Sequence, residues 1–503
     1  MQTKKIYCFI LCFCAFSIAY ADEQTSTNYI EGNFPPSTKQ NESIQRKVKL
    51  SLDDAILLAV RTNPNVQNSQ LAHVLQKFDL WIQQWQFLPH YSFGASANYG
   101  RSIVGGQPST TNQNFNVQPN ASLLTPIGTN ISINSTNSQS DHYNPSLSAQ
   151  IQQPLMRGFG RAIVEANLNN ARDSEYISRL SIEGVLRTTV TGVINSYLDV
   201  VNAESTLTID KEALARAEKS VEQTKLFIQA GHKAGNELIT VQANVATAKS
   251  QLENDKNNVK QTRYALLAAI GVDPNSNLDF SNLNIENLIN KYHSPTLQET
   301  KNLILENDIQ YQTDKITLNG MTTRNVMIAE DNTRWQLNLN ANVTTGSGSG
   351  GGQNAGVNSL LNGSNEGQSI GLTLSIPIDD QFSKQSVLSA KIALKESRLA
   401  LMQEKWNKET GAINGWNSVI SAERTLRFAI SAEKLQIQTY NLSYQKYLHG
   451  LIDSLELQTA QVQLIQAQQA SLSARIAYLK SLVNLDFLMG HTLRTWDVKV
   501  RFA

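Results

Sequence analysis

The residue types that most often perform chemistry are few in this 503-residue sequence, and their spacing does not build a catalytic centre. The seven histidines show no metal-ligand spacing. His232 and His449 fall where long helices are expected to turn, which would suit metal entry, although exposed turn histidines are equally common. There is no glycine-rich phosphate loop and no nucleophile elbow. The sequence therefore predicts a protein that is not an enzyme and that holds neither cofactor nor metal.

All three cysteines lie near the N-terminus, inside a segment typical of a secretory signal. Lys4 and Lys5 supply its charged start, and residues 6–18 form an apolar core that is shorter than a membrane helix of about 20 residues. Residues 19–21 read Ala-Tyr-Ala, a signal-cleavage site. We expect residues 1–21 to be removed, with a short membrane anchor as the alternative. The mature chain then contains no thiol.

The charge balance argues against nucleic acid as a partner. Removing the two signal lysines from the 43 basic residues leaves 41 against 42 acidic residues, and no basic tract stands out. No later apolar run reaches the length of a membrane helix. If the chain enters a membrane beyond its signal, it must do so as a closed β-barrel, because only helices and closed barrels satisfy every backbone polar group in lipid.

Four segments without charge alternate apolar and polar residues with the period of a β-strand. We expect these strands at about 90–100, 144–154, 335–345 and 368–378. Their apolar faces would meet lipid and their polar faces a wet lumen, whereas a soluble sheet with one solvated face is the alternative. The predicted lipid-facing residues are Tyr91, Phe93, Tyr99, Leu147, Ile151, Leu337, Leu339, Val343, Leu372 and Leu374.

The strand pattern occurs twice. The pattern that starts at Tyr91 returns at Trp335, 244 residues further on, while Pro154 returns as Pro377, 223 residues further on. Such a duplication is typical of a repeat architecture. We interpret the difference as a longer first loop, with residues 100–143 irregular and rich in Gly, Asn and Ser.

Long helical patterns follow each strand pair. In the first, apolar residues recur at intervals of seven from Leu186 to Ile228, which indicates a supercoiled helix packed against partners. We expect long helices at about 160–230, 237–271, 384–447 and 453–489, and shorter ones at 52–85 and 296–330. The expected organisation is a signal peptide (1–21), a polar segment (22–49), a first repeat (50–294), a second repeat (295–490) and a C-terminal tail (491–503).

Four strands cannot close a barrel, since small closed barrels need about eight. An open strand edge is not viable in lipid, because its backbone groups would have no hydrogen-bond partners. The sequence therefore predicts that several chains share one barrel.

In the order of these elements the chain resembles the TolC family of bacterial outer-membrane efflux channels. The matching features are Leu52-Asp-Asp-Ala followed by Asn63-Pro64, Phe87-Leu-Pro before a strand, and Tyr447-x-x-Gly before Leu457-Gln-Thr-Ala-Gln. The resemblance implies an α+β membrane protein with an internal two-fold repeat. It also implies a homotrimer in which four strands per chain form a twelve-stranded outer-membrane β-barrel, continuous with a long periplasmic α-helical barrel.

The implied function is a passive exit duct of a tripartite efflux or type I secretion system. The chain would lie in the bacterial outer membrane, in contact with its lipid, with most of its mass in the periplasm. Its implied partners are a periplasmic adaptor (membrane fusion) protein and an inner-membrane efflux pump or ABC exporter. A drug duct and a duct for a secreted protein look alike in sequence. A secreted coiled-coil structural or adhesive protein with a soluble β cap is the alternative from another class.

The resemblance also implies a gate at the periplasmic tip, which family members close with a tyrosine, a basic residue, an aspartate and rings of acids. By position, Tyr447 matches the tyrosine and Glu456 the first ring acid, whereas Thr459 stands where a second acid often lies. Ile452 replaces the basic residue and Thr240 the aspartate, so the salt bridge is missing.

Two acids near the tip are left to replace that salt bridge, Asp453 and Glu237. Asp453 and Glu456 equally suit a solvated helix start, where acids favour the helix dipole. A ring of three Glu456 carboxylates would instead select cations.

Overall fold

The computed structural model of the protein describes residues 48–103, 105–106, 109–139, 143–276, 278–280, 288–289, 291–292, 295–346 and 366–500. The expected signal peptide, the polar segment up to residue 47 and most of the loop after residue 346 lie outside the described residues. The chain divides into two units, one of residues 1–49 and 277–279 and one of residues 50–276 and 280–503. The short strands β1 (Val48–Leu50) and β6 (Leu278–Phe280) pair with each other in a two-stranded sheet.

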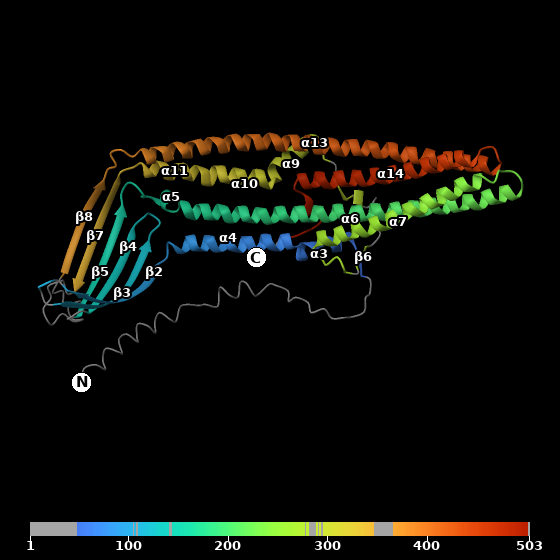
Figure 1. The fold of residues 1–503 in the computed structure, drawn as a ribbon. Coiled ribbons are helices and arrows are strands. Elements are labelled where there is room, and N and C mark those ends of the chain that lie inside the picture. The colour runs from blue at the N-terminus through green and yellow to red at the C-terminus, as the bar shows by residue number, and fades with distance from the viewer. Residues whose placement is uncertain are drawn as a thin grey trace. The chain divides into compact units, whose positions relative to one another are not determined.

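One antiparallel sheet of six strands lies at one end of the larger unit, in the order β2-β3-β4-β5-β7-β8 (Figure 1). Its two edges are β2 and β8. The strands are β2 (His90–Ser102), β3 (Thr110–Leu124), β4 (Asn130–Gln139), β5 (Tyr143–Pro154), β7 (Gln336–Gly346) and β8 (Glu366–Ser375).

The expectation of an irregular loop over residues 100–143, and with it of four strands per chain, is wrong. β3 and β4 form a hairpin that lies between β2 and β5 in the sheet. In β3 the apolar residues Phe115, Val117, Ala121 and Leu123 alternate with Asn, Gln and Ser, so the strand period is present. The many Asn and Ser residues make the segment look like a loop by composition alone.

A tight turn closes this hairpin at the end of the sheet where the helices begin. The Thr125 backbone N–H donates to the Thr129 carbonyl at 2.8 Å, and Gly128 adopts a φ of +97°. A Cβ on Gly128 would come within 2.7 Å of the Gly158 carbonyl oxygen, so only glycine allows this approach. β3 and β4 therefore run alongside β2 and β5 from one end of the sheet to the other.

The register places apolar residues of all six strands on one face. Tyr91 lies opposite Ala121, Ala121 opposite Ile133, Ile133 opposite Ala149, and Ala149 opposite Val343. Of the residues predicted to face lipid, Leu337 and Leu339 are half-buried. The others are exposed in the single chain: Tyr91, Phe93, Tyr99, Leu147, Ile151, Val343, Leu372 and Leu374.

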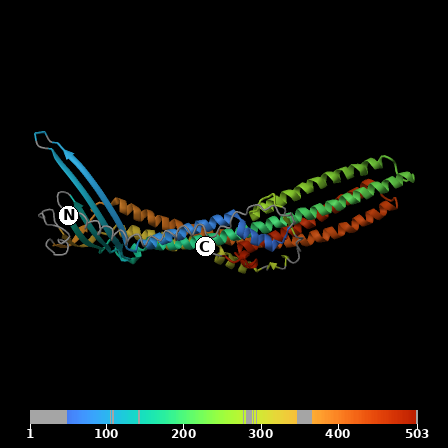
Figure 2. The same cartoon turned by 90° about the horizontal axis from the view of Figure 1, so that it is seen from below.

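Of the helices, α6 (Ala166–Gln229) and α13 (Gln381–Leu448) run from this sheet to two turns at the opposite end of the larger unit (Figures 1 and 2). No helix in the described part of the chain is long and apolar enough to cross a membrane. The helices are α3 (Leu52–Thr62), α4 (Pro64–Trp85), α5 (Arg161–Val164), α6 (Ala166–Gln229), α7 (Glu237–Ile270), α9 (Leu297–Asn307), α10 (Ile309–Thr317), the π-helix η1 (Leu318–Thr322), α11 (Thr323–Asn332), α13 (Gln381–Leu448), α14 (Ser454–Leu488) and α15 (Thr492–Thr495).

Proline divides the helix expected over residues 52–85. Asn63, which precedes Pro64, is extended (φ −65°, ψ 124°) because proline disfavours the helical region for the residue before it. The break supplies donors to the end of α7: Thr62 Oγ1 donates to the Ile270 carbonyl at 2.9 Å and Asn63 Nδ2 to the Ala269 carbonyl at 2.8 Å. These bonds satisfy carbonyls that a helix end leaves without partners.

The core of the chain follows α6. In the middle of α6, the predicted seam residues Leu186, Val193 and Val200 are buried. Beyond Ala203 the buried positions shift to a second series at the same interval of seven, Ala203, Asp210, Ala217 and Thr224. The predicted seam residues Leu207, Leu214, Val221 and Ile228 are only half-buried there. A heptad pattern with two interleaved series does not tell which series packs within the chain.

Candidate functional site at the helical turns

Two turns with the same backbone geometry lie at the end of the helices furthest from the sheet. After α6, Gly231 has a φ of +75° and the His232 N–H donates to the Phe227 carbonyl at 2.9 Å. After α13, Gly450 has a φ of +68° and the Leu451 N–H donates to the Lys446 carbonyl at 2.9 Å. Glycine suits both places because each helix ends with a left-handed residue.

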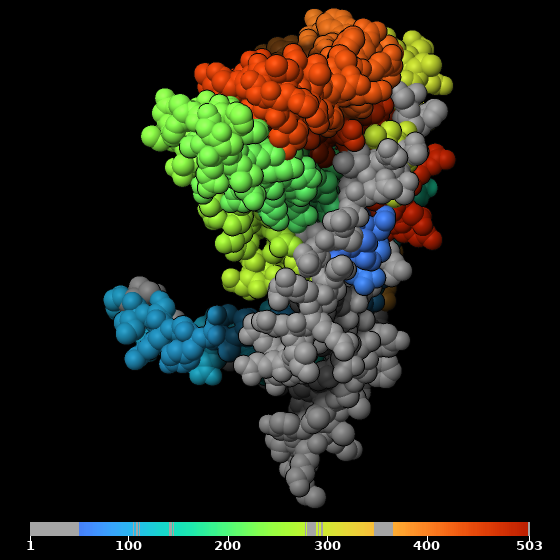
Figure 3. Space-filling view, turned by 90° about the vertical axis from the view of Figure 1, so that its right-hand side faces the viewer, coloured from blue at the N-terminus to red at the C-terminus, as the bar shows by residue number. Residues whose placement is uncertain are grey.

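The two turn regions lie side by side, seen end-on in Figure 3 as the green and the orange-to-red parts. Tyr447, on the last turn of α13, is fully buried against α6. Its hydroxyl shares a 2.8 Å hydrogen bond with the Thr224 hydroxyl, which donates to the Ser220 carbonyl at 2.7 Å. The Phe227 ring packs edge-on against it, with ring centroids 5.7 Å apart.

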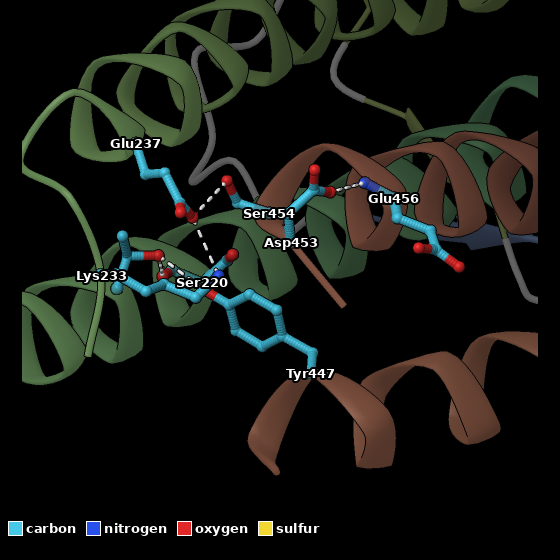
Figure 4. A network of polar contacts seen from close by, with 8 residues as sticks. Ser220, Lys233, Glu237, Tyr447, Asp453, Ser454 and Glu456 are labelled. Atoms are coloured by element: carbon cyan, nitrogen blue, oxygen red, sulfur yellow. Dashed lines mark hydrogen bonds and ion pairs between the residues drawn. The ribbon is translucent and has the colours of Figure 1, made fainter. Parts of the chain in front are cut away.

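A lysine from the first turn joins this tyrosine to an ion pair (Figure 4). Lys233 Nζ lies 4.2 Å from the centroid of the Tyr447 ring and 2.8 Å from Glu237 Oε2. The Lys233 side chain is 8 % exposed, so both contacts are shielded from water. A cation over an aromatic face is stabilised most when it is desolvated.

Glu237 connects the ion pair to α14. Ser454, the first residue of α14, donates from its hydroxyl to Glu237 Oε2 at 2.9 Å. Burial acts to raise the pKa of Glu237, but hydrogen bonds from Lys233 and Ser454, with the charge of Lys233, outweigh it and hold the pKa below its usual value. The carboxylate therefore stays ionised and binds both turns together. In this way Tyr447, Lys233, Glu237 and Ser454 form one contact set, which we call the clasp network.

The other predicted tip residues lie outside the clasp network. Asp453 caps α14, where its Oδ1 accepts from the Glu456 N–H at 2.8 Å. The Glu456 side chain is exposed and points away from Tyr447 in Figure 4. Thr459 and Thr240 are exposed on their helices, and the Thr459 hydroxyl donates to the Leu455 carbonyl at 2.9 Å.

Sequence reasoning missed Lys233, Thr224 and Ser454. It sought the cation after Gly450, where Ile452 stands, whereas the structure places a cation on the other turn. The signal that could have found Lys233 is its spacing of four residues from Glu237, which suits an ion pair at a helix start. The two turn histidines, His232 and His449, are both exposed.

Comparison with known proteins identifies the family. The family described as "Outer membrane efflux protein" matches residues 55–272 and 322–491, well over half of the chain. The chain belongs to the outer membrane efflux protein family. It is therefore an outer-membrane efflux channel protein, with a large helical part in the periplasm. No curated protein matches the sequence.

Several solved membrane proteins share the fold at low sequence identity. A membrane protein from Pseudomonas aeruginosa has a TM-score of 0.67 and 16 % identity, with 87 % of this chain and 92 % of that one covered. CusC has a TM-score of 0.67 and 15 % identity, with 90 % and 95 % covered. The open state of MtrE from Neisseria gonorrhoeae has a TM-score of 0.66 and 16 % identity, with 92 % and 96 % covered.

Proposed function

We propose that three copies of this chain form a closed duct that passively conducts substrates out of the cell from an inner-membrane pump. A periplasmic adaptor (membrane fusion) protein would join the duct to an efflux pump or an ABC exporter. The observation that carries the proposal is the six-stranded sheet, which has two exposed edges, β2 and β8, and one face that is apolar across all six strands in the half nearer the helices. Edges of this kind need partner strands in lipid, and another copy of the chain supplies them.

Exposed apolar residues on α13 support assembly in the periplasm as well. Phe428, Leu435 and Leu442 recur at intervals of seven and are 73 %, 63 % and 59 % exposed in the single chain. A seam of this spacing is buried when a neighbouring helix packs against it. Together with the half-buried series on α6, it gives each chain two helical surfaces for its neighbours. The proposal thus accounts for apolar surface that a monomeric secreted coiled-coil protein would expose to water.

The exit-duct proposal is tested by deleting the gene and measuring drug susceptibility and the secreted proteome together. Increased susceptibility, or loss of a secreted protein, is expected and separates the two kinds of cargo. Purified chain should run as a heat-modifiable trimer from the outer-membrane fraction. A monomer found only in periplasmic extract would overturn the proposal.

The clasp network is proposed as the gate at the tip. The ion pair of Lys233 and Glu237, with Ser454 and Tyr447, holds the α6–α7 turn against the α13–α14 turn. Glu237→Gln removes the ionic contact and leaves a similar shape, so we expect a larger single-channel conductance in planar bilayers. Lys225→Ala, at an exposed position of α6, is the matched control and should conduct as the natural protein does. Equal conductance of all three proteins would rule out the gate.

A further inference from the structure

The β3–β4 hairpin is built into the membrane sheet. β2 pairs with β3 from His90 opposite Ser122 to Ser102 opposite Thr110, and β4 pairs with β5 from Asn130 opposite Gln152 to Gln139 opposite Tyr143. The four strands have 13, 15, 10 and 12 residues. A transmembrane strand needs about 9–11 residues, so all four reach across a bilayer.

The chemistry of the hairpin also suits lipid. Neither β3 nor β4 contains an Asp, Glu, Lys or Arg. Ala121 and Ile133 continue the apolar face between Tyr91 on β2 and Ala149 on β5. Phe115 and Ile133 are 51 % and 48 % exposed on this face. The match holds in the half of the hairpin nearer the helices, whereas the outer half of β4 places Ser135, Asn137 and Gln139 on the same face.

The pairing of the hairpin is interrupted at Pro119 and its neighbour Gln118. Pro119 pairs with Phe93 on β2, and the β3–β4 register resumes unshifted at Asn120. Proline lacks the N–H that a central strand donates, so one missing ladder contact is expected there. The unchanged register on either side shows that β3 continues across the interruption.

We propose that each chain contributes six strands to the shared barrel, so that β2 of one copy pairs with β8 of the next and three copies close an eighteen-stranded wall. This inference rests on the trimeric duct proposed above. Because barrel diameter grows roughly linearly with strand number, the wall would be roughly 1.5 times as wide as one of twelve strands. The hairpin is then a size-determining element of the outer pore, which admits bulkier cargo than four strands per chain would allow.

The direct test is cryo-electron microscopy of the full mature trimer in lipid nanodiscs, with the strands of the barrel counted. Eighteen strands are expected. A closed trimer with twelve strands, and the hairpin outside the wall, would overturn this inference and leave the exit duct standing. Failure to form a closed trimer would overturn both proposals.

Disulfide trapping tests the hairpin independently, because all three natural cysteines lie within residues 1–21. Ala95→Cys with Val117→Cys joins opposite residues of β2 and β3, and Ile133→Cys with Ala149→Cys joins β4 and β5. Mild oxidation in intact outer membranes should link each pair within one chain, as read by mass spectrometry of the digested protein. Ala95→Cys with Gln118→Cys is the matched control, since successive strand residues point to opposite faces. Unlinked test pairs, or equal linkage in the control, would contradict the six-stranded wall.

Discussion

The two longest helices, α6 and α13, have 64 and 68 residues, yet they differ sharply in burial. α6 buries residues along nearly its whole length and contacts α4, α7 and α14. In α13 only Ala412, Val419 and Tyr447 are buried. α6 therefore forms the core of the chain, whereas α13 leaves its apolar side open. In the proposed trimer, that open side faces the next copy.

The largest expected effect comes from the core helix. Leu198 of α6 is fully buried, and Leu198→Ala should lower the free energy of unfolding by about 2–5 kcal/mol, because it leaves a cavity. Thermal unfolding of the detergent-dissociated chain, followed by circular dichroism, measures this effect. Leu435→Ala on α13 is the matched change at an exposed site and should shift that transition little. Equal shifts for the two variants would remove the distinction between the helices.

A second prediction concerns the open helix. Leu435→Asp places a charge in the exposed apolar series of α13, and a desolvated charge is costly at a packed interface. We expect loss of the trimer with helix content unchanged, measured by light scattering and circular dichroism in detergent. Asn441→Asp introduces the same charge at an exposed polar position further round the helix and should leave the trimer intact. A normal trimer with Leu435→Asp would show that α13 does not face its neighbour.

A smaller effect is expected where α6 meets its return helix. Asp210 of α6 and Asp255 of α7 are buried side by side, and Gln469 donates to Asp210 Oδ1 at 3.2 Å. Burial first, then the hydrogen bond and charge of Asp255, raise the pKa of Asp210 to about 7, although Gln469 and Arg216 oppose the shift. Since an unfolded aspartate releases its proton near pH 4, the folded chain holds an extra proton between these values.

Stability from this pair is therefore complete at acid pH and is lost as the pH rises towards 7. The melting temperature of the natural protein should fall between pH 5.5 and pH 8. Asp255→Asn removes the like charge and should flatten that dependence, whereas Asp199→Asn, at a more exposed ion pair with Lys480, should not. If the melting temperature of Asp255→Asn still fell with pH as steeply as that of the natural protein, Asp255 would not be a cause of the raised pKa of Asp210.

The smallest effect should come from the acids that begin the two return helices. Glu237 is held by Lys233 and Ser454, whereas Glu456 is exposed. If three Glu456 carboxylates ring the pore, Glu456→Ala should reduce cation selectivity and divalent block in single-channel recordings. Identical selectivity and block would leave Glu456 as an acid that only favours the helix dipole.

The sequence predicted the parts of the fold that have a clear period. Period-two alternation located β2, β5, β7 and β8, and apolar spacing located α6, α7, α13 and α14. The β3–β4 hairpin was missed because Asn and Ser occupy its polar face and Pro119 interrupts its pattern. The clasp lysine was missed for another reason: Lys233 is distant from Tyr447 in sequence, and only the packing of the two turns brings them together.

The polar face of the six-stranded sheet has a consequence for transport. On that face Ser92, Asn120, Asn134, Ser148 and Thr344 lie in successive strands, and no Asp, Glu, Lys or Arg interrupts them. Amides and hydroxyls both donate and accept hydrogen bonds, so they can replace the hydration of a passing solute whatever the sign of its charge. If this face lines the proposed duct, its wall carries no formal charge that would retain anions or cations. In the proposed duct, discrimination by charge would then fall to the opposite end, and the outer section would work as a neutral, well-hydrated outlet.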